Sequence, residues 1–204
     1  MNANTPAQLT PEAIGTPFEG GFYGGNIRAY DGTFAIVWAP KAQGDVKGLW
    51  LPKYDLVPGA MSCFDSMANT RAMAEAGSPI AQAALSATIN GHTDWCVPAR
   101  DVLEMGYRYL KPTTYGNSAS FRDGDNASSI PVGYPYTETT PAQTSVQAFQ
   151  KGAAEAFNDA WYWSSTQCSE FNAYLQFFYY GDQFNDFKEY EGRCRFVRLI
   201  QLSS

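Results

Sequence analysis

The stretch WYWSSTQCSEFNAYLQFFYYGDQFNDFKEYEGRCRFVRLI, residues 161–200, contains two kinds of sequence. Its ends, WYWSST and RCRFVRLI, are rich in the aromatic and β-branched residues that favour strands. Between Cys168 and Gly192, nine Phe and Tyr residues are mixed with Asn, Asp, Ser and Gly. The ends predict buried strands, and the residues that we assign to the core are Trp161, Trp163, Phe178, Val197 and Leu199.

The ring-rich middle of this stretch has two readings. AYLQFFYY, residues 173–180, fits a core strand with alternate side chains on opposite faces. In DQFNDFKEY, residues 182–190, the rings alternate irregularly with Asp, Asn and Lys and match neither a strand nor a helix period. We therefore predict an exposed binding segment over residues 182–190.

Composition limits the class of protein. A chain of 204 residues with 45% hydrophobic and 17% charged residues is long and apolar enough for one buried core. The high aromatic share, with 18 Gly and 12 Pro, predicts short elements and much ordered loop. A net charge of −6 without a Lys/Arg cluster argues against nucleic acid or an anionic membrane as partner.

The N-terminal residues show no organised pattern. Residues 1–17 are polar, contain three prolines and have no period, so we expect a flexible arm or a contact with a neighbouring subunit. They lack the basic start and apolar run of a signal peptide, and nowhere do 18 apolar residues follow one another. Residues 18–204 are expected to form a single domain.

Hydrophobic spacing and turn residues predict the other elements. Residues 18–39 alternate around a DG turn and predict a β-hairpin, and a short strand is expected over 48–51. A helix capped by Asp65 or Ser66, with Met67, Thr70 and Ala74 facing inward, is interrupted at residues 77–79 and followed by further helix. The remaining expectations are a helix over residues 99–111, a long surface loop or insertion over about 112–145, and a short third helix over 146–159.

No catalytic or metal constellation stands out. The single histidine, His92, lies in the turn-like text NGHTDW, and no nucleophile motif accompanies it. Asp123, Asp125 and Asn126 offer oxygen ligands, but the spacing of a calcium loop is missing, so a solvated turn is favoured. The four cysteines form no CxxC pair; we expect free thiols, with a Cys63–Cys96 disulfide as the alternative. We accordingly expect neither an enzyme nor a bound cofactor or metal.

Four segments occur in a recognisable order: GHTDWCVPARDVLEM, AFNDAWYWSSTQ, AYLQFFYYGDQ and KEYEGRCRFVRLI. This order resembles bacterial and phage domains with a C-type-lectin fold, which share a "DW.LP...EL" helix, a "YWSST" strand, an "F..G" turn and a closing "RVR.VR" strand. Cys96 stands where that pattern usually has Arg, and Cys194 where it has Val. The resemblance covers residues 90–200 and implies an α+β fold of short, twisted antiparallel strands, two to three helices and long loops.

Within that superfamily, residues 168–192 look like the variable region of proteins diversified by retroelements. There, adenine-directed copying rewrites Asn codons at their first two bases, and such codons cannot encode Gln, Glu, Lys, Met or Trp. The residues of this excluded group, which we interpret as framework, are Glu170, Gln176, Gln183, Lys188, Glu189 and Glu191. The predicted diversified, ligand-binding positions are Phe171, Asn172, Leu175, Phe177, Tyr179, Tyr180, Asp182, Phe184, Asn185, Asp186, Phe187 and Tyr190.

The resemblance implies a binding function. Tyr and Phe supply contact area with few torsions to freeze, while Ser, Asn, Asp and Gly supply adaptable hydrogen bonds, as in antibody loops. The expected protein is displayed on a phage tail, or is extracellular by assembly, and binds a protein or glycan of a target cell surface, with homo-oligomerisation or assembly into the tail possible. The alternatives are a calcium-dependent sugar lectin, although EPN, QPD and WND motifs are missing, and a relative of formylglycine-generating enzymes, for which Cys168 and Cys194 are poor candidates.

Overall fold

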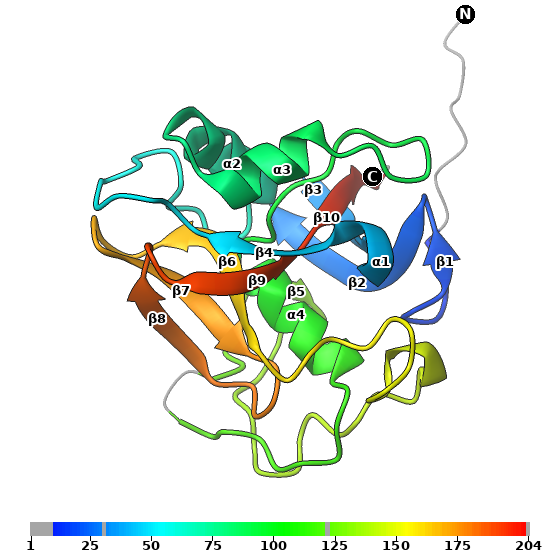
Figure 1. Ribbon diagram of the computed structural model, residues 1–204. Helices are drawn as coiled ribbons and strands as arrows, with labels where there is room; N and C mark the ends of the chain where they lie inside the picture. Colours follow the sequence, from blue (N-terminus) through cyan, green and yellow to red (C-terminus); the bar gives the residue numbers. More distant parts are fainter. Residues whose placement is uncertain (1–9, 30–31, 121–122, 203–204) are drawn as a thin grey trace, which may run out of the picture.

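The computed structural model describes residues 10–29, 32–120 and 123–202 (Figure 1). It contains two curled sheets and several helices, an α+β arrangement. The strands are β1 (Pro17–Phe18), β2 (Gly21–Ala29), β3 (Gly32–Trp38), β4 (Asp45–Leu49), β5 (Ser129–Ile130), β6 (Trp161–Gln167), β7 (Asn172–Phe177), β8 (Gln183–Phe187), β9 (Glu191–Arg195) and β10 (Val197–Gln201). The helices are α1 (Lys41–Gly44), α2 (Ser66–Glu75), α3 (Pro79–Ser86), α4 (Arg100–Leu110) and the 3₁₀ turn η1 (Gln147–Phe149).

The first sheet has the order β1-β2-β3-β10, with β5 paired to β2. The predicted hairpin is confirmed, because β2 and β3 pair antiparallel with Ala29 opposite Gly32; Asp31 of the predicted turn lies outside the described residues. Strand β10 returns from the end of the chain to pair with β3, where Val197 lies opposite Trp38. Two segments far apart in sequence thus share one sheet.

The second sheet has the order β4-β9-β6-β7-β8 and is antiparallel except for the parallel contact of β6 with β9. The strand predicted over residues 48–51 is confirmed in part, because β4 begins earlier, at Asp45. RCRFVRLI was expected as one strand but forms two, β9 in this sheet and β10 in the other. The change occurs at Phe196, whose amide donates to Gly44 and whose carbonyl accepts from Ala39 instead of from a ladder partner.

Three helices cover the sheets. The predicted N-cap of α2 is confirmed, since the Asp65 carboxylate accepts from the Ala68 amide at 3.0 Å. Its inward face is only partly as expected: Thr70 is buried, but Met67 and Ala74 are half-buried, and Asn69 and Met73 are buried instead. Helix α4 agrees with its prediction and contacts β2, β6 and β7 (Figure 1). None of the helices in the described ranges combines the length and apolar character that a membrane crossing requires.

The segment from 112 to 159 differs from its prediction. Apart from β5 it is irregular, as expected, but several of its polar side chains are buried rather than solvated, because they hydrogen-bond α4 and the backbone. Asn126, for example, donates to Glu104 at 2.7 Å and to the Asp101 carbonyl at 2.8 Å. The third helix is reduced to η1, since Gly152 takes a φ of +88° that a right-handed helix does not allow.

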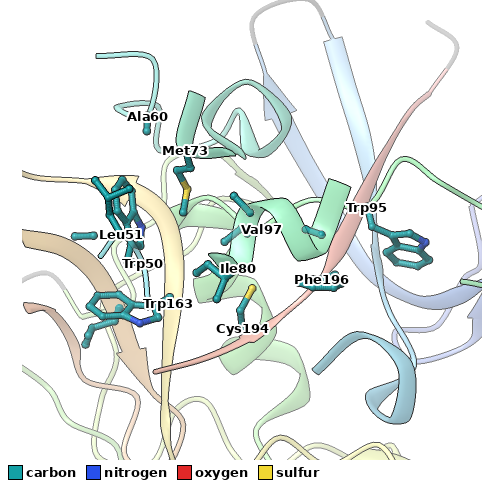
Figure 2. Packing of buried hydrophobic residues seen from close by; sticks show 14 of the residues in the cluster. Trp50, Leu51, Ala60, Met73, Ile80, Trp95, Val97, Trp163, Cys194 and Phe196 are labelled. Atoms are coloured by element: carbon teal, nitrogen blue, oxygen red, sulfur yellow. The ribbon is translucent and has the colours of Figure 1, made fainter. Parts of the chain in front are cut away.

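Two hydrophobic cores lie on opposite sides of the central strands. One of them, which we call the Trp50 core, includes Trp50, Ile80, Trp163 and Phe196 (Figure 2). The Phe178 core lies around α4, and its members include Trp38, Tyr162, Phe178 and Val197. Trp161 was expected in the core and is not: it shares a strand face with Trp163, but as the first residue of β6 it lies at the strand end, where it is 37% exposed.

Part of the predicted N-terminal arm is described. Within residues 10–17, the Gly15 amide donates to the Tyr23 carbonyl at 2.7 Å and Ile14 packs against the Phe178 core. Pro17 begins β1 opposite Phe22. From Ile14 onward the segment therefore contacts the rest of its own chain, whereas a flexible arm or a contact with a neighbouring subunit was predicted up to residue 17.

Candidate ligand-binding surface

The ring-rich segment folds as an antiparallel hairpin at the edge of the second sheet (Figure 1). Strand β7 pairs with β6 on one side and with β8 on the other, so that Leu175 lies between Trp163 and Phe184. Residues 182–190 match no strand period in the sequence, yet Gln183–Phe187 forms strand β8. As the outermost strand, β8 is half-buried or exposed throughout, which explains its lack of a buried period.

Eleven of the twelve predicted binding residues have side chains that reach the surface of this hairpin. Five of them are rings that are exposed by 41% to 62%. Leu175 is the exception and corrects the prediction: it is 5% exposed and packs in the Trp50 core. The exposed rings are Phe171, Tyr180, Phe184, Phe187 and Tyr190, and the half-buried residues are Asn172, Phe177, Tyr179, Asp182, Asn185 and Asp186.

One group of rings gathers at the end of the hairpin where β7 begins and β8 ends. The centroid of Phe187 lies 5.6 Å from that of Tyr190 and 6.0 Å from that of Tyr54. Phe171 lies 5.4 Å from Tyr54. We call these four residues the Phe187 cluster; each remains more than two-fifths exposed, although ring pairs at such distances attract one another.

A second group lies at the opposite end, around the turn between β7 and β8. Tyr179 lies 4.2 Å from Tyr180 and 4.6 Å from Tyr115, measured between ring centroids. Trp161 stacks on Phe177 at 4.8 Å. We call these five residues the Tyr179 cluster. The hairpin thus carries ring surfaces at both ends, with Phe184, 62% exposed, between them on β8.

Three predicted framework residues hold the hairpin in place. Gln176 is buried and donates to the Gly181 carbonyl at 3.2 Å, which fixes the turn. The Gln183 side chain accepts from the Gly124 amide at 2.9 Å, and the backbone amide of Gln183 donates to the Asp123 carboxylate at 3.0 Å. These bonds join the hairpin to the insertion. The other framework residues, Glu170, Glu189 and Glu191, are exposed.

Lys188 is the most deeply placed framework residue. It is fully buried, and its ammonium donates to the Asp55 carbonyl and to the Gln167 side chain, each at 2.7 Å. The ammonium also lies 4.6 Å from the ring centroid of Trp50. Burial lowers the pKa of this amine to about 8. Lys188 therefore anchors the end of β8 to the 50–61 loop beneath the Phe187 cluster.

The sequence interpretation missed the rings that other parts of the chain contribute. Tyr54 comes from the loop after β4, Tyr115 from the loop after α4, and Trp161 from the start of β6. Tyr54 and Tyr115 are isolated rings in Pro-containing text, where no period predicts a direction. Only the fold brings them to residues 171–190.

Asp123 and His92, which the sequence offered as metal-binding and catalytic candidates, make hydrogen bonds within the fold. Asp123 was expected in a solvated turn but is buried, and its carboxylate accepts from the Ser118 hydroxyl at 2.7 Å and from two backbone amides. His92 is half-buried in a turn that bridges to Ile89. Within the described ranges, no group of three or more His, Cys, Asp or Glu side chains is placed to hold a metal ion.

None of the four cysteines, all of which lie within the described ranges, is in a disulfide, in agreement with the expectation of thiols. Cys96 and Cys194 are buried, and burial raises the pKa of both thiols, which disfavours the reactive thiolate. Cys63 and Cys168 are half-buried. Cys194 packs in the Trp50 core (Figure 2), so a Cys168–Cys194 pair in an open pocket has no support here.

Comparison with models of known protein families, with curated proteins and with solved structures finds no match.

Proposed function

We propose that this chain is a ligand-binding protein with a C-type-lectin-like fold, whose hairpin surface is diversified by adenine-directed retroelement copying. In this proposal the protein is carried on a phage tail and binds a protein or glycan on the surface of a host cell. Its role is recognition rather than catalysis.

One observation carries the proposal: the residues that rewritten Asn codons cannot encode include those that hold the hairpin, whereas eleven of the twelve candidate positions, all of which such codons can encode, lie at its surface. Gln176 and Lys188 are buried and Gln183 bonds the insertion. Phe171, Phe184 and their fellow candidates are at the surface, with Leu175 as the exception. A surface that varies without unfolding its base requires such a division of roles.

The order and type of the elements support the lectin-like part of the proposal. The DWCVP segment leads into α4, the YWSST segment is β6, and the AYLQFFYYGD segment is β7 followed by a turn at Gly181. The closing segment provides β9 and β10. This order of helix, strand and turn is consistent with the resemblance, although the closing segment is divided between two strands rather than one.

The exposure of the rings supports recognition of a partner. Nine rings in two clusters, with Phe184 between them, form an apolar surface that is unusual for a protein without a partner. Buried aromatic anchors contribute about 2 kcal/mol or more each to many interfaces, while neighbouring polar residues adjust complementarity. Asn172, which donates to Asn185 at 2.8 Å, and Asp186 supply such polar groups beside the rings.

The proposal is tested with two displayed libraries of the full chain. In the first, the eleven surface candidates receive codons with two random bases and a pyrimidine third base. In the second, Gln176, Gln183 and Lys188 receive fully random codons. We expect most members of the first library to resist protease like the parent and to yield binders when selected against a panel of purified proteins.

The second library is the control for folding, and most of its members should lose protease resistance because buried polar partners are left unpaired. Equal loss of folding in both libraries would refute the division into base and binding surface. A folded first library that yields no binders would refute the binding function. Diversification itself further requires, near the gene and beside a reverse transcriptase gene, a second copy of the segment that differs from it mainly at adenines. The absence of this copy would refute that part of the proposal.

A further inference from the structure

The Phe187 cluster is bordered by carboxylates that the proposed diversification cannot change. Glu170 precedes Phe171 in the chain, and Glu189 precedes Tyr190; both carboxylates are exposed. Glu189 also accepts a hydrogen bond from the Tyr54 side chain. Two fixed negative charges therefore lie directly beside the exposed rings.

Neither carboxylate is held in an ion pair within the part of the chain that the structure describes. No salt bridge there reaches Glu170 or Glu189. The exposed lysines of the neighbouring strand and loop have other partners, since Lys53 binds Asp55 at 3.0 Å and Lys47 binds Glu191 at 2.6 Å. The ammonium of Lys188 interacts electrostatically with Glu170, but it is buried beneath the rings and cannot contact a ligand.

We propose that the Phe187 cluster docks onto a protein surface rich in Arg and Lys, and that Glu170 and Glu189 impose this preference on every version of the diversified surface. This inference rests on the proposed function and specifies its class of partner. Because Glu is outside the set that rewritten Asn codons encode, the two carboxylates stay while the rings beside them vary.

Both components of the surface favour a cationic partner. The faces of Tyr and Phe rings attract ammonium and guanidinium groups, most strongly when the contact is desolvated. Carboxylates at the rim add electrostatic complementarity, which raises the association rate and selects against partners of like charge. Phosphate-rich or acidic glycans would be repelled by the same rim, so a basic protein fits better than an anionic polysaccharide.

The test is an NMR titration of the full chain with two peptides of equal length. One contains Arg, Lys and Gly, and the other has Glu in place of each Arg and Lys. At a salt concentration of about 20 mM, where screening is weak, we expect the cationic peptide to shift the backbone amides of Phe171, Phe187 and Tyr190. The Glu170→Gln/Glu189→Gln double variant should bind the cationic peptide about fivefold more weakly, and about 300 mM salt should weaken binding to the parent similarly.

Glu12→Gln/Glu75→Gln is the matched control, because it removes two exposed carboxylates elsewhere and changes the net charge equally. It should bind the cationic peptide like the parent. Equal weakening in both double variants, shifts confined to other regions, or equal binding of the acidic peptide would overturn the inference. The failure of this inference can be told apart from the failure of the proposed function. If the first library yields binders to acidic and to basic panel proteins equally often, the charge preference is refuted while the binding function stands.

Discussion

Lys188 illustrates how a single residue supports the surface above it. The side chain of Lys188 crosses from the end of β8 to the 50–61 loop. The backbone amide of Lys188 donates to the Phe171 carbonyl at 3.0 Å. A buried ammonium whose bonded partners are neutral is costly unless hydrogen bonds and a ring face compensate for lost water. Here the Asp55 carbonyl, Gln167 and Trp50 provide that compensation.

This burial predicts a pH dependence of stability. The pKa of Lys188 is lowered from 10.5 to about 8 by folding, so between these values the unfolded chain binds more protons than the folded one. Stability therefore rises with pH through that window, and the gain is lost as pH falls through about 8. In denaturant titrations, the free energy of unfolding of the parent should therefore increase relative to that of Lys188→Met between pH 8 and pH 10.5.

Lys53→Met is the control for this prediction, since it removes an exposed ammonium from the same region. The parent and Lys53→Met should change in parallel with pH. A constant difference between the parent and Lys188→Met across the window would show that Lys188 titrates normally.

At the scale of elements, the turn between β7 and β8 depends on Gly181. Its φ is +84°, which favours glycine, and a Cβ there would lie 2.3 Å from the Tyr107 ring. Gly152 has nearly the same φ, +88°, but open space around its Cβ position. The two positions therefore separate the backbone cost of a substitution from its steric cost.

We predict that Gly152→Ala lowers the free energy of unfolding by about 1 kcal/mol, the cost of placing a side chain at this φ. Gly181→Ala should cost about 1 to 3 kcal/mol more, since Tyr107 is buried and cannot move aside freely. Urea denaturation of the two variants measures the difference. Equal losses would show that the turn and α4 adjust to each other without strain.

The elements also show what the sequence can predict. The hairpin of β2 and β3, α2, α3 and α4 have clear periods or caps and were predicted. Strand β8 was not, because an edge strand with both faces partly exposed needs no alternation. Phe187 and Tyr190 of the candidate surface were predicted, because they are residues that rewritten Asn codons can encode. Tyr54 and Tyr115 were not predicted, because they join the surface through long-range packing that no local sequence pattern indicates.

At the scale of the whole molecule, β9 and the first residue of β10 separate the two cores. Successive side chains of an extended chain point to opposite sides. Cys194 and Phe196 accordingly enter the Trp50 core (Figure 2), while Val197 enters the Phe178 core. Arg195 points toward the second side, where its guanidinium lies 4.9 Å from the Phe157 ring centroid and 5.2 Å from that of Phe149.

Arg195 is fully buried and joins distant parts of the chain. It donates to the Ala39 carbonyl after β3 at 2.8 Å, and to the carbonyl and carboxylate of Glu155 at 2.6 and 2.5 Å. The two other arginines of this segment also pair with carboxylates, since Arg193 binds Asp45 and Arg198 binds Asp94. Of the three, Arg195 is the most buried.

We therefore predict that Arg195→Met lowers the free energy of unfolding by about 3 kcal/mol. The substitution removes the cation paired with the largely buried Glu155 carboxylate, which keeps its bond from the Lys41 amide, and it removes the donor to the carbonyls of Ala39 and Glu155. Arg195→Lys should lose less stability than Arg195→Met, because it keeps the positive charge. It should still be less stable than the parent, because a lysine cannot reach all three acceptors. Lys47→Met, which breaks an exposed ion pair, should stay within about 1 kcal/mol of the parent. Urea denaturation tests the series, and a loss in Arg195→Met no larger than in Lys47→Met would mean that hydrophobic packing alone joins the two cores.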